Sequence, residues 1–347
     1  MGGDIETIKQ RLEIAEVVGG YVKLEKSGQS LKGRCPFHNE KTPSFFVSPG
    51  RQSYYCFGCG AKGDIFTFVQ EVEGLSFKEA LKTLADKAGV ELKGQSLSRE
   101  AKSEREEMLQ VVEEATKFFE NELAKNKEGR DYLQSRGISE ETRKEWRIGF
   151  APAEWRSLYS YLLNLGIKQS VLLKAGLVKK VASAPEKNPY DVFRDRLTFP
   201  LSDQNGEIVA FSGRALGKGV EPKYLNSPDT PLFTKSELLY GLDKAKNEIR
   251  KKNYAVLVEG QMDLVLSHQA GIKNTVASSG TAFTEAHLNR LKKLSPRIIL
   301  AFDGDSAGEK AGEKASELAL SLGLEVKVAK LPTGKDPADV IRENPED

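Results

Sequence analysis

Four residues near the N-terminus have the types and spacing of a metal site. They form two pairs, Cys35 with His38 and Cys56 with Cys59, and two residues separate the members of each pair. All 3 cysteines of the chain belong to this set. Three thiolates and one imidazole suit tetrahedral zinc, and four protein ligands leave no open position for a reactive water. We therefore predict one structural zinc ion rather than disulfides.

Aromatic residues are concentrated beside these four ligands. A short-stranded zinc ribbon has little core, so we expect most of the rings to pack inside it. One or two of them could instead stack on unpaired nucleic-acid bases. The rings concerned are Phe37, Phe45, Phe46, Tyr54, Tyr55 and Phe57.

A second set of residues, all acidic, occurs in the C-terminal quarter. Glu259 follows one predicted strand, Asp303 and Asp305 follow another, and Asp336 follows a third. If these strands are parallel, their carboxyl ends meet at one edge of the sheet, and the side chains can converge. Crowded carboxylates repel one another unless cations bind between them, and oxygen ligands suit Mg²⁺ or Mn²⁺.

Two such ions could activate an attacking hydroxyl and stabilise a leaving phosphate oxygen. We accordingly predict Glu259, Asp303 and Asp305 as the catalytic carboxylates. The competing interpretation is that these acids are solvated and cap helices. That interpretation stays open for Asp263, which lies on the helix after Glu259, and for Asp339.

Basic and polar residues are frequent in the loops that precede the acidic segment. They could hold a triphosphate or template phosphates, although single surface cations are usually just solvated. The candidates are Arg194, Arg196, Arg214, Lys223, Tyr224, Asn226 and Lys235.

The elements that position these residues are visible in the hydrophobic periodicity. Residues 1–92 contain an initial amphipathic helix, strands at 44–48 and 53–55, and helices at 65–73 and 76–88, with Ser76 as N-cap. Residues 93–107 are polar and form the predicted flexible linker. Residues 108–252 mix helices with strands at 196–201 and 207–212, and Asn205-Gly206 between those strands predicts a hairpin.

Residues 253–347 alternate strands with helices. Strands are predicted at 254–258, 275–277, 297–302 and 324–331, with helices at 262–270, 284–294 and 307–322 between them. This alternation predicts a parallel sheet with right-handed crossovers. The fold class is thus a multidomain chain in which a zinc ribbon precedes an α+β part and an α/β part.

Composition narrows the function less than the motifs do. The chain has 347 residues and a net charge of +2, so a nucleic-acid surface would have to be a local patch. No apolar run reaches the roughly 18–20 residues of a membrane span, and the first ten residues do not resemble a signal peptide. We expect a cytoplasmic protein that binds no membrane.

These motifs together resemble the bacterial DnaG-type DNA primases, over nearly the whole chain. The Cys35–His38 and Cys56–Cys59 pairs resemble the family's zinc domain, and E-G-Q-M-D at 259–263, D-G-D at 303–305 and the D-P step at Asp336 resemble its Toprim fold. Between them, S-R-G at 135–137, F-R-D-R at 193–196, G-R at 213–214, P-K-Y-L-N-S-P at 222–228 and L-Y-G-L at 239–242 resemble its core polymerase motifs.

The resemblance implies an enzyme of DNA replication, a DNA-directed RNA polymerase that makes short RNA primers on single-stranded DNA from ribonucleoside triphosphates. Glu259, Asp303, Asp305 and Asp336 would hold the catalytic Mg²⁺ or Mn²⁺, and Asp263 would support them. Arg136 would join the seven basic and polar candidates above in lining the nucleotide and template groove.

Two features depart from the family. Its usual D-P-D is here D-P-A-D, with Ala338 in the second acidic place and Asp339 one position later. The chain also ends at Asp347, whereas the family usually continues with more polymerase helices and a helicase-binding domain. A replicative helicase is therefore an expected partner whose binding domain is absent. We expect a monomer, although the linker could let the ribbon of one molecule serve another.

Two other functions remain open from the residues themselves. A Toprim nuclease or topoisomerase would use a similar acidic site, but a topoisomerase needs a tyrosine nucleophile from another domain. A non-catalytic zinc-ribbon adaptor would only bind single-stranded DNA. Chain extension from nucleoside triphosphates would distinguish primer synthesis from both.

Overall fold

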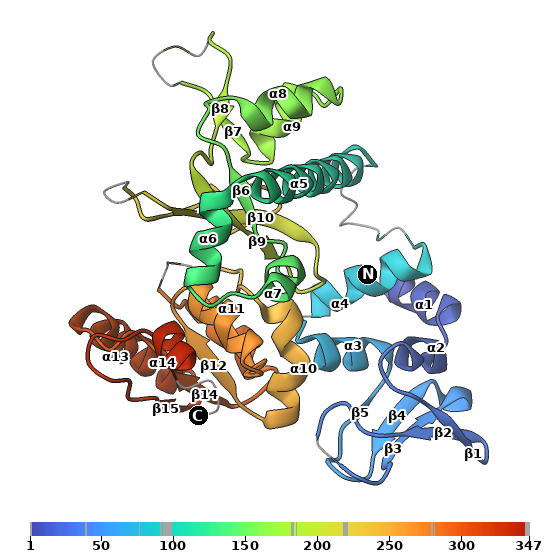
Figure 1. The fold of residues 1–347 in the computed structure, drawn as a ribbon. Coiled ribbons are helices and arrows are strands. Elements are labelled where there is room, and N and C mark those ends of the chain that lie inside the picture. Colours follow the sequence, from blue (N-terminus) through green and yellow to red (C-terminus); the bar gives the residue numbers. More distant parts are fainter. Residues whose placement is uncertain are drawn as a thin grey trace.

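The computed structural model describes residues 2–38, 40–75, 77–90, 92, 99–181, 184, 186–217, 221–278, 280 and 282–343. Three successive parts are visible along the chain (Figure 1). They are a small N-terminal sheet with helices, a mixed α+β part, and a parallel sheet with its own helices. The predicted fold class is confirmed, whereas the exact domain boundaries stay predictions.

The N-terminal part is a five-stranded antiparallel sheet with short helices against it. Its strand order is β1-β2-β3-β4-β5. The strands are β1 (Glu25–Ser27), β2 (Ser30–Gly33), β3 (Phe45–Ser48), β4 (Ser53–Cys56) and β5 (Lys62–Gly63). The helices are α1 (Gly2–Arg11), α2 (Ile14–Gly19), α3 (Ile65–Glu73) and α4 (Phe77–Ala88).

Local chemistry explains the ends of these elements. The Asp64 side chain accepts hydrogen bonds from the backbone of Phe66 and Thr67 and so begins α3, and Gly74 in the left-handed region ends it. The single amphipathic helix predicted at the start is two helices instead, α1 and α2. Ser76, predicted as the N-cap of the next helix, lies outside the described residues.

The structure describes only part of the predicted linker. Residues 93–98 lie outside the described residues, but α5 (Arg99–Lys125) is one continuous helix of 27 residues. Its polar first half is paired with the neighbouring part of the fold: Arg105 donates to Glu207 at 3.0 Å, and Lys174 pairs with Glu104. Residues 99–107 are therefore helical rather than a flexible linker, because these ion pairs replace the apolar contacts that the sequence lacks there.

The central part is built on an antiparallel sheet with the order β11-β10-β9-β6, against which α5 packs. The strands are β6 (Gly149–Ala151), β9 (Arg196–Ser202), β10 (Ile208–Ala215) and β11 (Tyr224–Asn226), with a separate pair β7 (Val178–Lys179) and β8 (Tyr190–Asp191). Its other helices are α6 (Lys127–Ser135), α7 (Glu140–Glu145), α8 (Ser157–Asn164) and α9 (Gln169–Lys174). The predicted hairpin at Asn205-Gly206 is confirmed, with Gly206 at φ 85°.

The C-terminal part is a four-stranded parallel sheet, as predicted. Its order is β13-β12-β14-β15, so the strands that carry Glu259 and Asp303 are neighbours. The strands are β12 (Ala255–Val258), β13 (Thr275–Ala277), β14 (Arg297–Leu300) and β15 (Glu325–Val328). The helices are α10 (Leu242–Lys252), α11 (Gln261–Gln269), α12 (Glu285–Lys292), α13 (Ser306–Ser321) and α14 (Pro337–Glu343).

The N-terminal part carries the four predicted zinc ligands and is called the zinc-binding part from here on. It rests on the C-terminal part, as Figure 1 shows for α3 and α10. Lys246 of α10 pairs with Glu73 of α3, and the two side chains are only 15% and 12% exposed. The buried Arg250 donates to the backbone oxygen of Glu71 at 2.6 Å. Arg290 of α12 pairs with Glu79 at 3.2 Å. This docking was not predictable from the sequence.

Reversing one charge of the docking surface should release the zinc-binding part. In Lys246→Glu, two carboxylates would face each other where water is largely excluded, and breaking such a buried pair costs about 3–5 kcal/mol. Small-angle X-ray scattering should then give a larger radius of gyration, and the double variant Lys246→Glu/Glu73→Lys should restore the compact value. Lys251→Glu, at an exposed surface pair, is the control. An unchanged radius in Lys246→Glu would show that this pair does not hold the docking.

Candidate zinc and carboxylate sites

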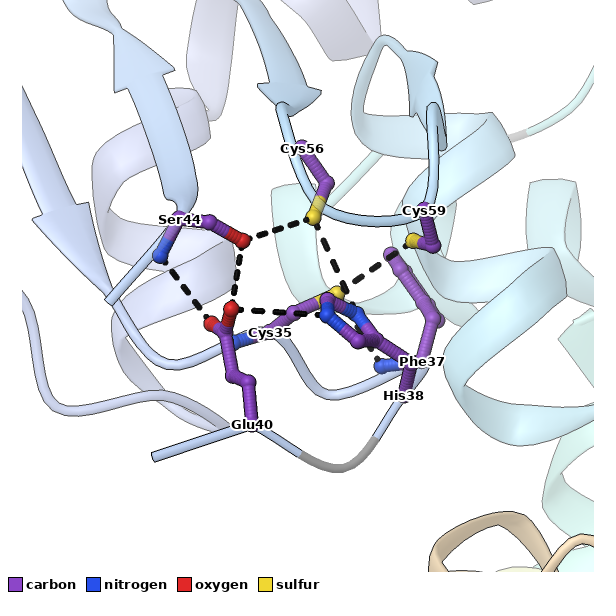
Figure 2. Close-up of polar contacts among 7 residues, drawn as sticks. All are labelled: Cys35, Phe37, His38, Glu40, Ser44, Cys56 and Cys59. Carbon is purple, nitrogen blue, oxygen red and sulfur yellow. Dashed lines mark hydrogen bonds and ion pairs between the residues drawn. The ribbon is translucent and has the colours of Figure 1, made fainter. Parts of the chain in front are cut away.

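The four predicted zinc ligands come together in the folded chain. One ligand atom from each of Cys35, His38, Cys56 and Cys59 lies within 4.8 Å of all the others. Cys35 and Cys59 have their sulfur atoms 3.8 Å apart, and Cys56 Sγ is 3.8 Å from His38 Nδ1 (Figure 2). Zn–S bonds of about 2.3 Å in a tetrahedron give S···S separations of about 3.8 Å. Both separations match those of a tetrahedral zinc site.

The chain folds this way because β4 and the loop before β3 bring the two pairs together. Cys56 ends β4, and its backbone N–H donates to Ala61 O at 2.8 Å, which forms the turn that carries Cys59. Glu40 accepts from the Cys35 backbone at 2.6 Å and from the Ser44 backbone at 3.1 Å. Burial opposes its charge, yet hydrogen bonds from Ser44 and Cys35 hold the pKa of Glu40 below its usual value.

The aromatic residues beside the ligands divide into two groups. Phe45 and Tyr54 are buried and stack with ring centroids 5.1 Å apart, and Phe37 and Phe68 pack around them. Phe57 and Tyr55 are 72% and 42% exposed, with rings 4.8 Å apart. Of the six rings predicted beside the ligands, Phe37, Phe45 and Tyr54 pack in the core, and the exposed pair supplies the candidates for base stacking.

The acidic residues gather at the carboxyl edge of the parallel sheet. Glu259 directly follows β12, and its Oε1 accepts from the Asp303 backbone N–H at 3.3 Å after β14. Among the described residues they do not form a group as tight as the zinc ligands. They nevertheless influence one another electrostatically, because burial and the charges of Glu259, Asp336 and Asp305 raise the pKa of Asp303 to about 6.

Glycine at two positions allows this arrangement. A Cβ at Gly304 would lie 2.4 Å from the backbone oxygen of Pro332, and one at Gly308 would lie 2.2 Å from that of Asp303. The D-G-D loop therefore presses directly against the loop that carries Asp336: Gly304 N donates to Lys335 O at 2.9 Å. Backbone contact without side chains brings the two acidic segments together.

Asp305 and Asp263 have additional structural roles. Asp305 is the N-cap of α13 and accepts from Ala307 and Gly308 at 2.9 and 2.8 Å. Asp263 is buried and accepts from Gly260 and Ala338 at 3.1 and 3.2 Å. Burial and the charges of Asp336 and Asp303 raise the pKa of Asp263 to about 7. The expected supporting role of Asp263 stays a prediction.

The departure at Ala338 has a visible packing reason. The Ala338 side chain is 1% exposed, and its backbone N–H already binds Asp263. The Asp339 carboxylate lies 3.0 Å from Arg342 Nη2 and 3.9 Å from Arg136 Nη2. In the folded chain Asp339 is therefore paired with two arginines, and one of them, Arg136, also lies near Asp336.

The expected groove residues fall into different environments. Arg136 Nη2 lies 3.6 Å from Asp336 Oδ2, and the exposed Lys223 is close enough to lower the pKa of Asp303. Arg214 donates to Tyr224, and its guanidinium lies over the Tyr132 ring at 5.3 Å. Asn226 lies on β11, opposite Ser212 of β10. Lys235 lies in the loop before α10.

The two arginines of the F-R-D-R motif contact other segments of the central part. Arg196 is 5% exposed and donates to the backbone oxygens of Pro222 and Lys223 at 2.7 and 3.3 Å, so it supports the lysine loop from beneath. Arg194 lies over the exposed Trp155 ring at 4.3 Å and over Tyr190 at 5.2 Å.

The sequence reasoning missed Trp155, Tyr132 and Gln261. Gln261 lies inside the quoted E-G-Q-M-D motif, is 1% exposed and donates to Ser212 Oγ at 2.6 Å, which ties α11 to β10. Because Gln261 belongs to this motif, the sequence could have identified it as a residue of the site. Nothing in the local sequence marks the two aromatic residues as partners of Arg194 and Arg214, because both contacts join segments distant in the chain.

The fold and these two sites define a protein with a Cys₃His zinc domain in front of a Toprim-containing core. Three family descriptions match it: CHC2 zinc finger over residues 2–100, DNA primase catalytic core, N-terminal domain, over 118–246, and Toprim-like over 256–341. The chain belongs to the DnaG-type DNA primase family.

Individual relatives agree with this assignment. The chain is 42% identical to the DNA primase of Halalkalibacterium halodurans and 38% identical to that of Clostridium acetobutylicum, covering 97% and 98% of this chain. It spans 57% and 56% of those proteins, just over half of their length. The structure of the zinc-binding and RNA polymerase domains of Aquifex aeolicus primase is 36% identical, with a TM-score of 0.65, and 98% of this chain and 82% of that chain are covered.

A structure of the DnaG primase catalytic domain bound to single-stranded DNA is also similar. It is 35% identical with a TM-score of 0.61, and the match covers 70% of this chain and 76% of that chain. No helix in the described part of the chain is long and apolar enough to cross a membrane.

Removing the zinc should unfold the N-terminal part while the rest of the chain stays folded. Structural zinc binding contributes about 10–16 kcal/mol to the folding of small zinc domains, and this sheet depends on four residues that the ion joins. Elemental analysis should find one zinc per chain, and Cys56→Ser should lose it. Both tryptophans, Trp146 and Trp155, lie in the central part, so their fluorescence should not change on chelation. A fluorescence change that accompanies zinc loss would contradict this separation.

Proposed function

We propose that this chain is the primer-synthesising part of a primase: it joins ribonucleoside triphosphates on a single-stranded DNA template and releases pyrophosphate. The observation that carries the proposal is the set of like-charged carboxylates at adjacent strand ends. Burial and neighbouring acids raise the pKa values of Asp303, Asp263 and Glu259, and such crowding is characteristic of sites that bind cations.

The donor set fits divalent metal ions. Carboxylate oxygens are preferred by Mg²⁺ and Mn²⁺, and Glu259, Asp303, Asp305 and Asp336 are half-buried or exposed at the rim. When bound, the metal would neutralise the triphosphate and favour ionisation of the attacking hydroxyl. Asp263 would hold the site together from beneath through its backbone contacts, as a supporting residue.

The basic residues around this edge fit the binding of phosphates. Lys223 lies near Asp303, and Arg136 near Asp336, so both could meet phosphates of the template or of a triphosphate drawn to the acidic centre. Arg214 on β10 provides a cation, and Tyr224 on the neighbouring β11 provides an aromatic ring. Tyr224, Asn226 and Lys235 would line the template path. Arg196 would act through the Lys223 loop, which it supports.

Family membership favours synthesis over the alternatives. The three cysteines and one histidine of the zinc site lie in the segment that matches the CHC2 zinc finger. The similar DnaG primase catalytic domain is bound to single-stranded DNA, which supports single-stranded DNA as the template here. The helicase partner stays a prediction from the family resemblance.

Primer synthesis should depend on the acidic centre. With labelled ribonucleoside triphosphates, single-stranded DNA and Mg²⁺ or Mn²⁺, we expect short, template-dependent RNA. Asp303→Asn and Asp305→Asn should reduce the rate by about 10²–10³-fold, since each removes a carboxylate that would hold the cations needed to stabilise the negative charge of the transition state. The amide in Asp305→Asn can still cap α13, so loss of activity would not reflect a lost helix cap.

Glu309→Gln, an exposed change in the first turn of the same helix, should keep full activity. Shortening of the DNA without RNA synthesis would indicate the nuclease alternative. DNA binding without any product, in wild-type and variants alike, would indicate the adaptor.

Lys223 should contribute a phosphate contact to template binding. Replacing it with alanine should lower the affinity for single-stranded DNA and reduce the slope of log K against log salt by about 0.7. Lys244→Ala is the matched control, because Lys244 is also exposed but lies over Trp146, away from the acidic edge. Both salt slopes are measured by fluorescence anisotropy. Equal slopes for wild-type and Lys223→Ala would show that Lys223 makes no phosphate contact with the DNA.

A further inference from the structure

The His38 ring faces the zinc ligands with one particular nitrogen. Its Nδ1 lies 3.8 Å from Cys56 Sγ, whereas its Nε2 lies 3.4 Å from Glu40 Oε2 (Figure 2). The ring fits into a slot beside Gly58, where an added Cβ would lie 2.5 Å from His38 Nε2 and 2.8 Å from Ser44 Oγ. Only Nδ1 therefore points to the position that a metal would occupy.

Glu40 makes contacts to both halves of the site. Its side chain is 9% exposed, and it accepts hydrogen bonds from the backbone of Cys35 and Ser44. The Ser44 hydroxyl donates to Glu40 Oε2 at 2.5 Å, and Ser44 Oγ lies 3.3 Å from Cys56 Sγ. One carboxylate thus connects the first ligand pair, the histidine ring and, through Ser44, the second pair.

We propose that Glu40 is a positioning residue of the zinc site, which accepts the Nε2–H of His38 and so directs Nδ1 to the metal. A hydrogen bond to the second nitrogen fixes both the tautomer and the orientation of a metal-binding histidine. Glu40 also accepts hydrogen bonds from the backbone of Cys35 and Ser44, which hold these two segments together.

The effect of Glu40 is geometric rather than a matter of net charge. Three thiolates already exceed the charge of Zn²⁺, so a further anion beside the site is electrostatically unfavourable. It is tolerated because hydrogen bonds from Cys35 and Ser44 satisfy its oxygens, and His38 Nε2 lies 3.4 Å from Oε2. An amide in its place would keep the size but present an NH₂ group to one of these donors.

The histidine nitrogen can be identified directly in the zinc-loaded wild-type protein. The chain has 3 histidines, and the other two, His268 and His287, are buried on α11 and α12. Long-range ¹H–¹⁵N correlation spectra should show His38 with a metal-bound Nδ1 and a protonated Nε2. A metal-bound Nε2 would overturn the proposal, and this readout requires no variant.

Zinc affinity provides the second test. In competition with a chromophoric chelator, Glu40→Gln should bind zinc about 10–100-fold more weakly, the usual effect of losing such a partner. The matched control Glu25→Gln changes an exposed glutamate on β1 of the same sheet and should leave the affinity unaltered. Equal affinities for wild-type and Glu40→Gln would refute the positioning role. If Glu40→Gln does not fold, the spectra of the wild-type protein decide the question alone.

Discussion

Mutual repulsion among carboxylates is the constraint on which the C-terminal part of this protein depends. Glu259, Asp303 and Asp336 are brought to one edge although each disfavours the ionisation of its neighbours, as the raised pKa of Asp303 indicates. The backbone maintains this arrangement. Gly304 and Gly308 allow main chain to touch main chain, and the α13 N-terminus and two backbone N–H groups hold Asp305 and Asp263. The fold thus maintains an acidic edge ready for cations.

The zinc-binding part follows a different principle. Its core of buried aliphatic and aromatic side chains is joined by the metal ligands and Glu40, which add connections across the small sheet. The same part is docked on α10 and α12 by largely buried ion pairs and by Arg250. This docking gives the exposed Phe57 and Tyr55 a definite position relative to the core, which a free linker alone would not do.

Much of the candidate site follows from residue type and spacing. The zinc ligands were recognisable because two short-range pairs of metal-binding residues contain every cysteine. The acidic edge was recognisable because strands and helices alternate, and parallel strands bring their carboxyl ends together. The predicted start of α5 came too late in the chain, because the first turns of this helix are polar and show no apolar periodicity. Ion pairs of Arg105 with Glu207 and of Glu104 with Lys174 hold these turns against the central part.

The sequence by itself determined the zinc ligands, the order of the elements and the strand ends that carry the acids, since all three depend on local spacing and periodicity. Only the tertiary structure decided that Arg196 lies beneath the Lys223 loop, that Asp339 turns to arginines, and that the zinc-binding part rests on α10. It also decided which nitrogen of His38 faces the metal site. These features depend on contacts between residues far apart in the chain, and no local pattern encodes such contacts.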